Sequence, residues 1–247
     1  MDTYYEHRLS IDSRDVDGLG RCRASALLGH MQEAATQAAE TGGFGREIVT
    51  EKYNGFWMLT RVWFLLSRPL MWGEDLTIRT WHRGAKRASM YRDYDLYVNG
   101  LPVGEGVSVW VLADRDTRRL VRLDRIGEFE GTDGGSLCKS VLLQKLRCPE
   151  ELTESGKRIL YYSDTDINGH VNNTRYADFA CDAVRQDMLP PERFLSRMQI
   201  GYLAECRPGE ILTLEAGEQE QGKYVRGVDK NGSPRFESEL IFSQVIS

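Results

Sequence analysis

The chain has 247 residues, a formal net charge of −5, 41 % hydrophobic residues and five cysteines. This length suits one large domain or two small ones, and the apolar fraction can form a core, which excludes wholesale disorder. The acidic balance argues against a nucleic-acid partner, and the cysteines lack the CxxC spacing of a zinc site. No apolar run is long enough for a membrane span, so we expect a cytoplasmic protein with reduced thiols.

The first half begins with a predicted strand, an acidic turn and a helix. Residues 4–11 alternate between apolar and polar side chains, and Asp15 and Asp17 mark the turn. Good helix formers fill residues 24–40. Four strands are predicted after this helix, at residues 57–66, 75–84, 89–98 and 103–114.

The second half has the same plan after a stretch without a clear pattern. A strand is predicted at residues 156–163, and apolar residues recur at helical spacing over residues 176–184. Either Asn172 or Asn173 is placed to cap that helix. Four further strands are predicted at residues 196–205, 211–219, 223–230 and 235–245.

Three pairs of segments match in the same order across the two halves. They are RDVDGLG with SDTDING, the strand around Arg61 with the strand around Arg197, and the hairpin signals Asn99-Gly100 and Asn231-Gly232. The offsets are 149, 136 and 132, which indicates a duplicated domain rather than a solenoid. We therefore predict an α+β protein with domains at residues 1–130 and 151–247 and a linker at residues 131–150.

The duplicate separates scaffold residues from candidate site residues. The Asp-x-Asp-x-x-Gly frame occurs in both halves, but only the second half has Asn168, His170, Glu205 and Cys206. The first half has Leu19 and Arg21 in place of Asn168 and His170, and the inert pair Pro69-Leu70 in place of Glu205 and Cys206. Each residue alone is typical of a helix cap or a solvated loop, whereas together they predict one working site and one degenerate copy. Beside a carboxylate a thiolate is disfavoured, so Cys206 is expected to be inert.

The run DTDINGHVNNTRYADF resembles the signature of the acyl-acyl carrier protein thioesterases, and YLAEC resembles the Glu-Cys segment of the same family. The resemblance spans nearly the whole chain and suggests a bacterial relative of the plant enzymes. It implies two tandem hotdog domains, each a long helix wrapped by a curled antiparallel sheet. It also implies hydrolysis of fatty acyl-acyl carrier protein without a metal or other cofactor, because the phosphopantetheine arm arrives with the carrier protein.

Carried over by residue, the family's catalytic set falls on Asp166, Asn168, His170 and Glu205, and Cys206 takes the place of a cysteine once proposed as nucleophile. In our hypothesis Glu205 and His170 position and deprotonate a water, while backbone N–H groups after Asn172 stabilise the oxyanion. Direct attack by a carboxylate stays open. An acyl-CoA hydrolase, an enoyl hydratase and a non-catalytic acyl-binding module are the alternative functions.

Two further sets of residues are candidates for substrate contact. Apolar residues of the first half that could line an acyl tunnel, or equally form ordinary core, are Leu27, Leu28, Met31, Trp57, Met58 and Trp63. Basic residues that could receive an acidic carrier protein are Arg83, Lys86, Arg87, Arg118, Arg119 and Arg122. Chain-length preference and homodimer formation are left open by the sequence.

Overall fold

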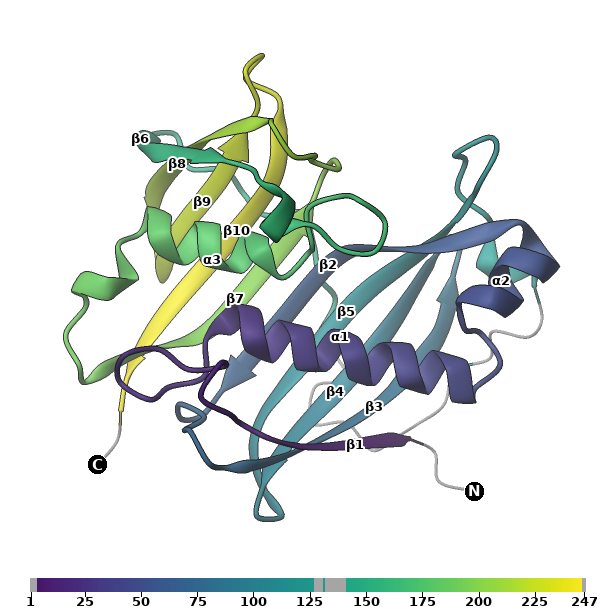
Figure 1. Ribbon diagram of the computed structural model, residues 1–247, viewed down its shortest axis with the longest axis horizontal. Coiled ribbons are helices and arrows are strands. Elements are labelled where there is room, and N and C mark those ends of the chain that lie inside the picture. The colour runs from purple at the N-terminus through teal and green to yellow at the C-terminus, as the bar shows by residue number, and fades with distance from the viewer. Residues whose placement is uncertain (1–3, 127–130, 132–140, 246–247) are drawn as a thin grey trace.

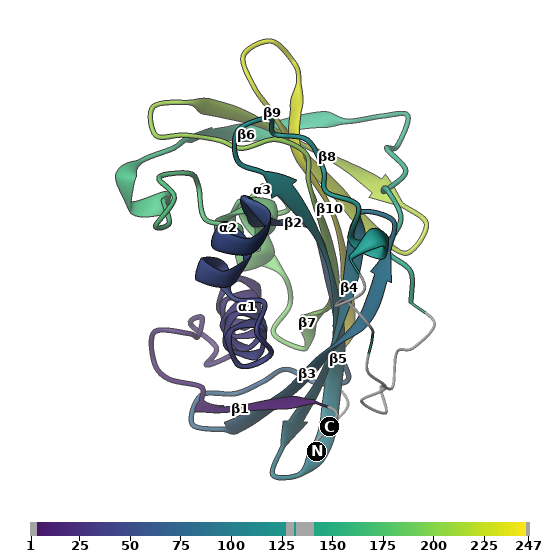
Figure 2. The same ribbon diagram turned by 90° about the vertical axis from the view of Figure 1, so that its right-hand side faces the viewer.

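The predicted strands join into one curved antiparallel sheet, and the helices lie on its concave face (Figures 1 and 2). The computed structural model describes residues 4–126, 131 and 141–245. The strands within these residues are β1 (Tyr5–Ser10), β2 (Gly55–Leu66), β3 (Asp75–Lys86), β4 (Ser89–Val98), β5 (Leu101–Asp114), β6 (Thr153–Ile159), β7 (Arg193–Tyr202), β8 (Ile211–Gln219), β9 (Gly222–Val228) and β10 (Pro234–Gln244). The α-helices are α1 (Ala24–Thr41), α2 (Arg46–Tyr53) and α3 (Arg175–Ala183), and short 3₁₀ turns are η1 (Leu123–Arg125), η2 (Tyr162–Asp164) and η3 (Gln186–Met188).

The order of the strands repeats across the sheet, as the sequence matches predict. The order is β1-β3-β4-β5-β2-β7-β10-β9-β8-β6, so each half contributes five strands with the same internal arrangement. The halves meet where β2 pairs with β7, and Trp63 lies opposite Gln199 in this pairing. Gln199 is the duplicate of Trp63 at the offset of 136, so this pairing places a residue opposite its own counterpart. A pseudo-two-fold axis therefore passes through the junction.

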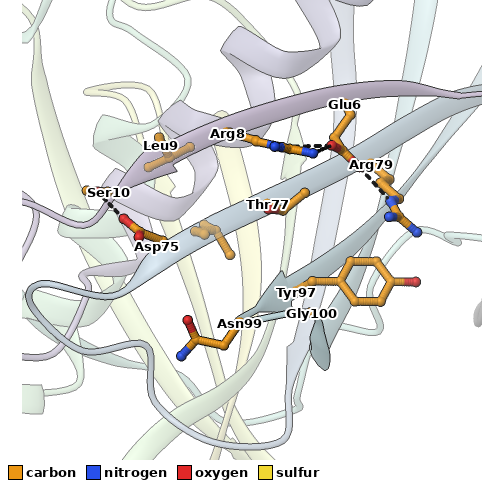
Figure 3. A pocket seen from close by; sticks show the side chains of 11 residues that line it. Glu6, Arg8, Leu9, Ser10, Asp75, Thr77, Arg79, Tyr97, Asn99 and Gly100 are labelled. Atoms are coloured by element: carbon orange, nitrogen blue, oxygen red, sulfur yellow. Dashed lines mark hydrogen bonds and ion pairs between the residues drawn. The ribbon is translucent and has the colours of Figure 1, made fainter.

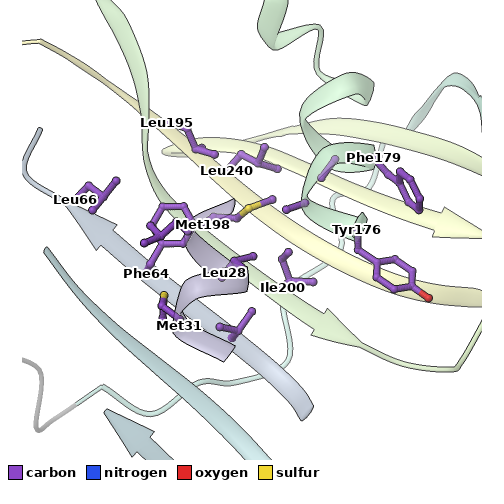
Figure 4. Close-up of a cluster of buried hydrophobic side chains, with 14 of the residues drawn as sticks. Leu28, Met31, Phe64, Leu66, Tyr176, Phe179, Leu195, Met198, Ile200 and Leu240 are labelled. Carbon is purple, nitrogen blue, oxygen red and sulfur yellow. The ribbon is translucent and has the colours of Figure 1, made fainter. Parts of the chain in front are cut away.

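Side chains along β2 alternate between the two faces of the sheet, so only every second one contacts the helices. Val62, Phe64 and Leu66 face the concave side and belong to the main core, whereas Trp63 packs on the convex side. Helix α1 buries its apolar stripe, which includes Leu28 and Met31, against this concave face (Figure 4).

The same core continues into the second half without a break. Figure 4 shows Met198 and Ile200 of β7 between the side chains of α1 and those of α3, such as Tyr176 and Phe179. The two halves therefore share one hydrophobic core on the helix side of the sheet.

Several details differ from the sequence-based expectation. Helix α2 was not predicted, and it lies in the insertion that lengthens the first half. Helix α3 has 9 residues against 18 in α1. Thr174 rather than an asparagine is the N-cap residue, and Asn172 instead accepts hydrogen bonds from the N–H and hydroxyl of Thr174. Strand β7 ends at Tyr202, so Glu205 lies in a loop rather than in a strand.

The predicted linker lies partly outside the described residues, which omit 127–130 and 132–140. Residues 141–147 lie against the sheet, where Leu143 packs with Trp63 and the carbonyl of Gln144 accepts a hydrogen bond from Gln199. The N–H of Leu146 donates to the buried carboxylate of Glu237 at 3.0 Å. In the part of the chain that the structure covers, no helix combines the length and apolarity needed to cross a membrane.

Candidate active site

The site is built on a tight turn between β6 and α3. The N–H of Asp166 donates to the carbonyl of His170 at 2.9 Å, and the N–H of Gly169 donates to the carbonyl of Asp166 at 3.0 Å. Gly169 has φ +73°, which a residue with a Cβ rarely adopts. Asn168 and His170 both lie in this turn. Val171, directly after His170, forms a backbone hydrogen bond to the loop that contains Cys206.

The first half repeats this turn bond for bond. The N–H of Asp17 donates to the carbonyl of Arg21, and the N–H of Gly20 donates to that of Asp17. The carboxylate of Asp17 accepts from the N–H of Leu19 at 2.8 Å, just as Asp166 accepts from the N–H of Asn168 at 2.8 Å. The aspartates thus form the turn in both copies, and the second copy adds the reactive side chains.

His170 and Glu205 come together in the second half only. The distance from Nε2 of His170 to Oε2 of Glu205 is 3.4 Å, and their side chains are 20 % and 46 % exposed. The N–H of Val171 donates to the carbonyl of Cys206 at 2.9 Å. Because this bond joins the residues that follow His170 and Glu205, it fixes the separation of the two side chains. The pair is open to water on the side of Glu205.

Asn168 is oriented by the carboxylate of Asp166. Besides the backbone bond, Nδ2 of Asn168 donates to Oδ2 of Asp166 at 3.3 Å, which directs the amide. Asp166 therefore both forms the turn and orients Asn168.

Cys206 follows Glu205 in the chain and belongs to the main hydrophobic core. It is fully buried beside Tyr176, and burial is the main reason that the pKa of its thiol is raised. A thiol in this setting is a poor nucleophile, because the thiolate is the reactive form. Its contribution is to packing.

Replacement of Cys206 by alanine is therefore expected to leave kcat within a few-fold of the native value. The lost side chain should lower the free energy of unfolding by about 1 kcal/mol through a small cavity. Steady-state turnover and thermal unfolding measure both quantities. Loss of turnover by two orders of magnitude in a folded Cys206→Ala protein would restore the nucleophile hypothesis.

Arg21, which stands in the first half where His170 stands in the second, forms hydrogen bonds between the two halves. Arg21 donates to the carbonyl of Arg193 at 2.8 Å and to that of Pro191. It thereby ties the first half to the start of β7. Since β7 duplicates β2 at an offset of 136, the pseudo-two-fold relation places His170 near the start of β2, around Gly55 and Trp57.

Several neighbours of the site were missed in the sequence. The hydroxyl of Tyr202 donates to the carbonyl of Asn173 at 3.1 Å and connects the end of β7 to the start of α3. The N–H groups of Thr174 and Arg175 donate to Asn172, so they are not available to an oxyanion. The N–H of Asn173 makes no hydrogen bond within the described residues, so it is the remaining candidate oxyanion donor. In the sequence, the run Asn172-Asn173-Thr174 just before the helix was the feature that pointed to these backbone N–H groups.

A small cavity lies between the two halves, next to the start of α3. It measures about 10 Å³, room for roughly one water, and lies between Asn173, Thr174 and Tyr202 of the second half and α1, β2, β4 and β5 of the first. Leu28 and Met31 line it. An acyl chain can enter only if such side chains move, and methionine is the most adaptable of the core residues.

The other tunnel candidates lie elsewhere. Leu27 is buried in the main core without lining the cavity, and Trp57 belongs to a second cluster near α2, where its Nε1 donates to the carbonyl of Phe44. Trp63 packs on the convex face, and Met58 lies opposite Val111 in the sheet, on the same face as Trp63.

The candidate basic residues differ in their exposure and in whether they form an ion pair with a carboxylate of this chain. Arg83 binds both carboxylate oxygens of Asp93 on the convex face, and Arg122 is paired with Asp124. Arg118 is exposed and its guanidinium lies 5.1 Å from the ring centre of Phe56, which is at the start of β2. The remaining candidates are all exposed, namely Lys86, Arg87 and Arg119.

A larger hollow on the described surface lies away from this site. It measures about 630 Å³ and lies at the edge formed by β1, β3 and the β4–β5 turn (Figure 3). Its walls are held by ion pairs of Glu6 with Arg8 and Arg79 and by a hydrogen bond from Ser10 to Asp75. Among the described residues, no cluster of three His, Cys, Asp or Glu side chains is arranged for a metal ion.

Comparison with known proteins identifies the same family for both halves of the chain. The family model described as acyl-ACP thioesterase N-terminal domain matches residues 2–126, and the model of the C-terminal domain matches residues 151–237. The chain is 27 % identical over 218 residues to the chloroplastic dodecanoyl-[acyl-carrier-protein] hydrolase of Cinnamomum camphora, covering 80 % of this chain and 56 % of that protein. It is 26 % identical over 225 residues to the chloroplastic palmitoyl-acyl carrier protein thioesterase of Gossypium hirsutum, covering 84 % and 53 %. The chain thus spans about half the length of the curated relatives it matches.

Solved structures share the whole architecture. An acyl-ACP thioesterase from Bacteroides thetaiotaomicron superposes with a TM-score of 0.85 at 23 % identity, covering 98 % of both chains. The 12:0-ACP thioesterase from Umbellularia californica gives a TM-score of 0.80 at 21 % identity, covering 99 % of this chain and 98 % of that one. These similarities confirm the predicted tandem hotdog fold.

Proposed function

Because the chain belongs to the acyl-ACP thioesterase family, we propose that it hydrolyses the thioester between a fatty acyl chain and the phosphopantetheine arm of acyl carrier protein. The products are a free fatty acid and the carrier protein with its free thiol. The contact between His170 and Glu205 at 3.4 Å, next to Asn168, is the observation that carries this proposal. It supplies a base, an acid and an amide to one point of the surface, and the sister turn lacks all three.

The chemistry requires an activated water and support for the developing oxyanion. Glu205 is the more exposed of the pair and accepts a hydrogen bond from the attacking water, while His170 shares the proton and returns it to the leaving sulfur. The amide of Asn168, held by Asp166, orients the water or the carbonyl. The N–H of Asn173 at the start of α3 is placed to stabilise the oxyanion, aided by the helix dipole.

The acyl chain enters the first half through the small cavity between α1 and the sheet. The cavity beside Asn173 leads under α1 toward β5, so the second half performs the reaction and the first half binds the chain. Burial of the alkyl chain there contributes roughly 0.8 kcal/mol for each methylene group.

A panel of acyl-carrier proteins with different chains tests this function directly. Release of the carrier thiol, measured together with the free fatty acid, should be catalytic and should depend on chain length. The same chains presented on coenzyme A should be poorer substrates, because they lack the protein surface. A preference for the coenzyme A thioesters would favour the acyl-CoA hydrolase instead.

The basic loop after β5 is proposed to receive the carrier protein. Arg118 stands over Phe56 at the start of β2, which is where the pseudo-two-fold relation places His170. Acidic carrier proteins are attracted to such positive loops, and the effect is screened by salt.

Reversing Arg118 and Arg119 to glutamate should raise KM for acyl-carrier protein by about tenfold at low salt. KM for acyl-CoA should change much less. Reversal of Arg8 and Arg14, which are exposed near the β1 edge, is the matched control and should alter neither value. Equal effects on the two substrates in the Arg118 and Arg119 variant would remove this loop from carrier binding.

A further inference from the structure

The concave face of the first half contains a buried cation that has no carboxylate partner among the described residues. Arg92 of β4 is 5 % exposed, and its one hydrogen bond within the described residues runs from Nη1 to the hydroxyl of Thr80 at 3.3 Å. The neighbouring Asp93 binds Arg83 instead, because alternation along β4 turns it to the convex face. Burial lowers the pKa of Arg92, and Tyr94 is the one titratable group that acts in the opposite direction.

Arg92 lies one strand beyond the small cavity between the two halves. Across the sheet, Ile200 of β7 pairs with Val62, Val62 with Ser108, and Ser108 with Arg92. Paired residues of adjacent antiparallel strands share a face, and each strand adds about 4.8 Å. Val62 and Ser108 line the cavity, so Arg92 is the next concave-face residue, about 5 Å beyond it.

The wall of the cavity next to Arg92 is also rich in donors. The indole N–H of Trp110 donates to the hydroxyl oxygen of Ser108 at 2.7 Å, and the hydroxyls of Ser108 and Tyr94 share one hydrogen bond at 2.9 Å. The indole N–H and the two hydroxyls have three protons that can be donated, and the two hydrogen bonds within the trio take up two of them. One hydroxyl proton is therefore left over for an acceptor outside the trio.

A buried cation and a spare hydroxyl proton beside this cavity need an acceptor oxygen. An unbranched alkyl end supplies none and would leave the guanidinium unpaired in an apolar surrounding, which is unfavourable. A water can serve in the empty state, since the cavity holds about one. In the loaded state the acceptor must come from the substrate itself.

We propose that Arg92, with Ser108 and Tyr94, binds an oxygen at the distal end of the acyl chain, so that the preferred substrates are oxygen-bearing rather than plain alkyl thioesters. This assignment rests on the proposed thioesterase function. It names the substrate class, with carboxylate as the strongest partner and hydroxyl or oxo groups as neutral ones.

The decisive experiment compares chains of equal length that end in methyl, hydroxyl or carboxylate, each presented on carrier protein. In the native enzyme kcat/KM should be about tenfold or more higher for the oxygen-bearing chains. Arg92→Met should lower the ratio of oxygen-bearing to methyl-ended turnover by about tenfold, most for carboxylate. Lys145→Met, at an exposed residue, is the matched control and should keep the native ratio.

A binding measurement separates failure of this inference from failure of the thioesterase function. Calorimetry with pantetheine thioethers that carry the same three chain ends does not depend on turnover, and Arg92→Met should abolish the preference for oxygen-bearing ends. If Arg92→Met does not fold, Ser108→Ala should weaken the same preference while keeping the cation. An unchanged ratio in a folded Arg92→Met protein, or native selectivity for methyl-ended chains, would overturn the inference.

Discussion

Replacement of His170 by glutamine is expected to lower kcat by about 10²–10⁴-fold, the usual contribution of a general acid–base residue. The side chain is 20 % exposed and contacts Glu205 at the surface, so the free energy of unfolding should change by less than about 1 kcal/mol. Glu205→Gln should lose activity to a similar extent, since the carboxylate and the imidazole act on the same water. Single-turnover hydrolysis of acyl-carrier protein and thermal unfolding give the two readouts.

The sister position offers a matched control for this result. Arg21→Gln removes the hydrogen bonds to the carbonyls of Pro191 and Arg193, so it should lower stability by about 1 kcal/mol and leave turnover close to native. The opposite outcome, in which His170→Gln keeps full activity, would show that the contact with Glu205 is not catalytic. Turnover in ¹⁸O-labelled water then distinguishes attack by water from attack by a carboxylate, because only the latter places enzyme oxygen in the first product.

The comparison of the two halves in sequence explains how much of the site could be predicted. The Asp-x-Asp-x-x-Gly frame was interpreted as scaffold, and the structure shows the same set of turn hydrogen bonds in both copies. Asn168 and His170 stood out because the sister turn has Leu19 and Arg21. The sequence could not show that Glu205 reaches His170, because that contact depends on the backbone bond between Val171 and Cys206, 35 residues apart.

The face that a strand residue occupies was harder to infer. The bulge between Leu59 and Arg61 shifts the alternation in β2, so Trp63 faces away from the helices although it lies in an apolar run. Arg92 did carry a signal, since it alternates with Met90 and Tyr94 on the buried face of β4. Its significance depends on the lack of a carboxylate partner among the described residues, which only the packed structure reveals.

The acidic turn also determines a large part of the stability of the second half. Asp164 is 1 % exposed and accepts hydrogen bonds from the N–H of Tyr161 at 3.0 Å, from Arg175 at 3.2 Å and from Arg158 at 3.3 Å. Burial alone would raise the pKa of this carboxyl, but the hydrogen bonds and the two guanidinium groups outweigh it and lower the pKa. Its counterpart Asp15 has a histidine, His30, in place of two arginines.

Asp164→Asn is therefore expected to lower the free energy of unfolding at pH 7 by about 2–3 kcal/mol. This is below the usual cost of breaking a buried ion pair, because both arginines are about one-third exposed. A carboxyl whose folded pKa is depressed stabilises the protein above its unfolded pKa of about 3.9 and loses that effect as the pH falls through the folded pKa. The difference between native and Asp164→Asn proteins should thus be constant from about pH 5 to 7 and narrow below about pH 4. Urea unfolding at each pH measures this, with Asp15→Asn as the matched variant and a smaller expected loss. A difference that stays constant down to the acid limit would show that Asp164 acts through its shape and hydrogen bonds rather than through its charge.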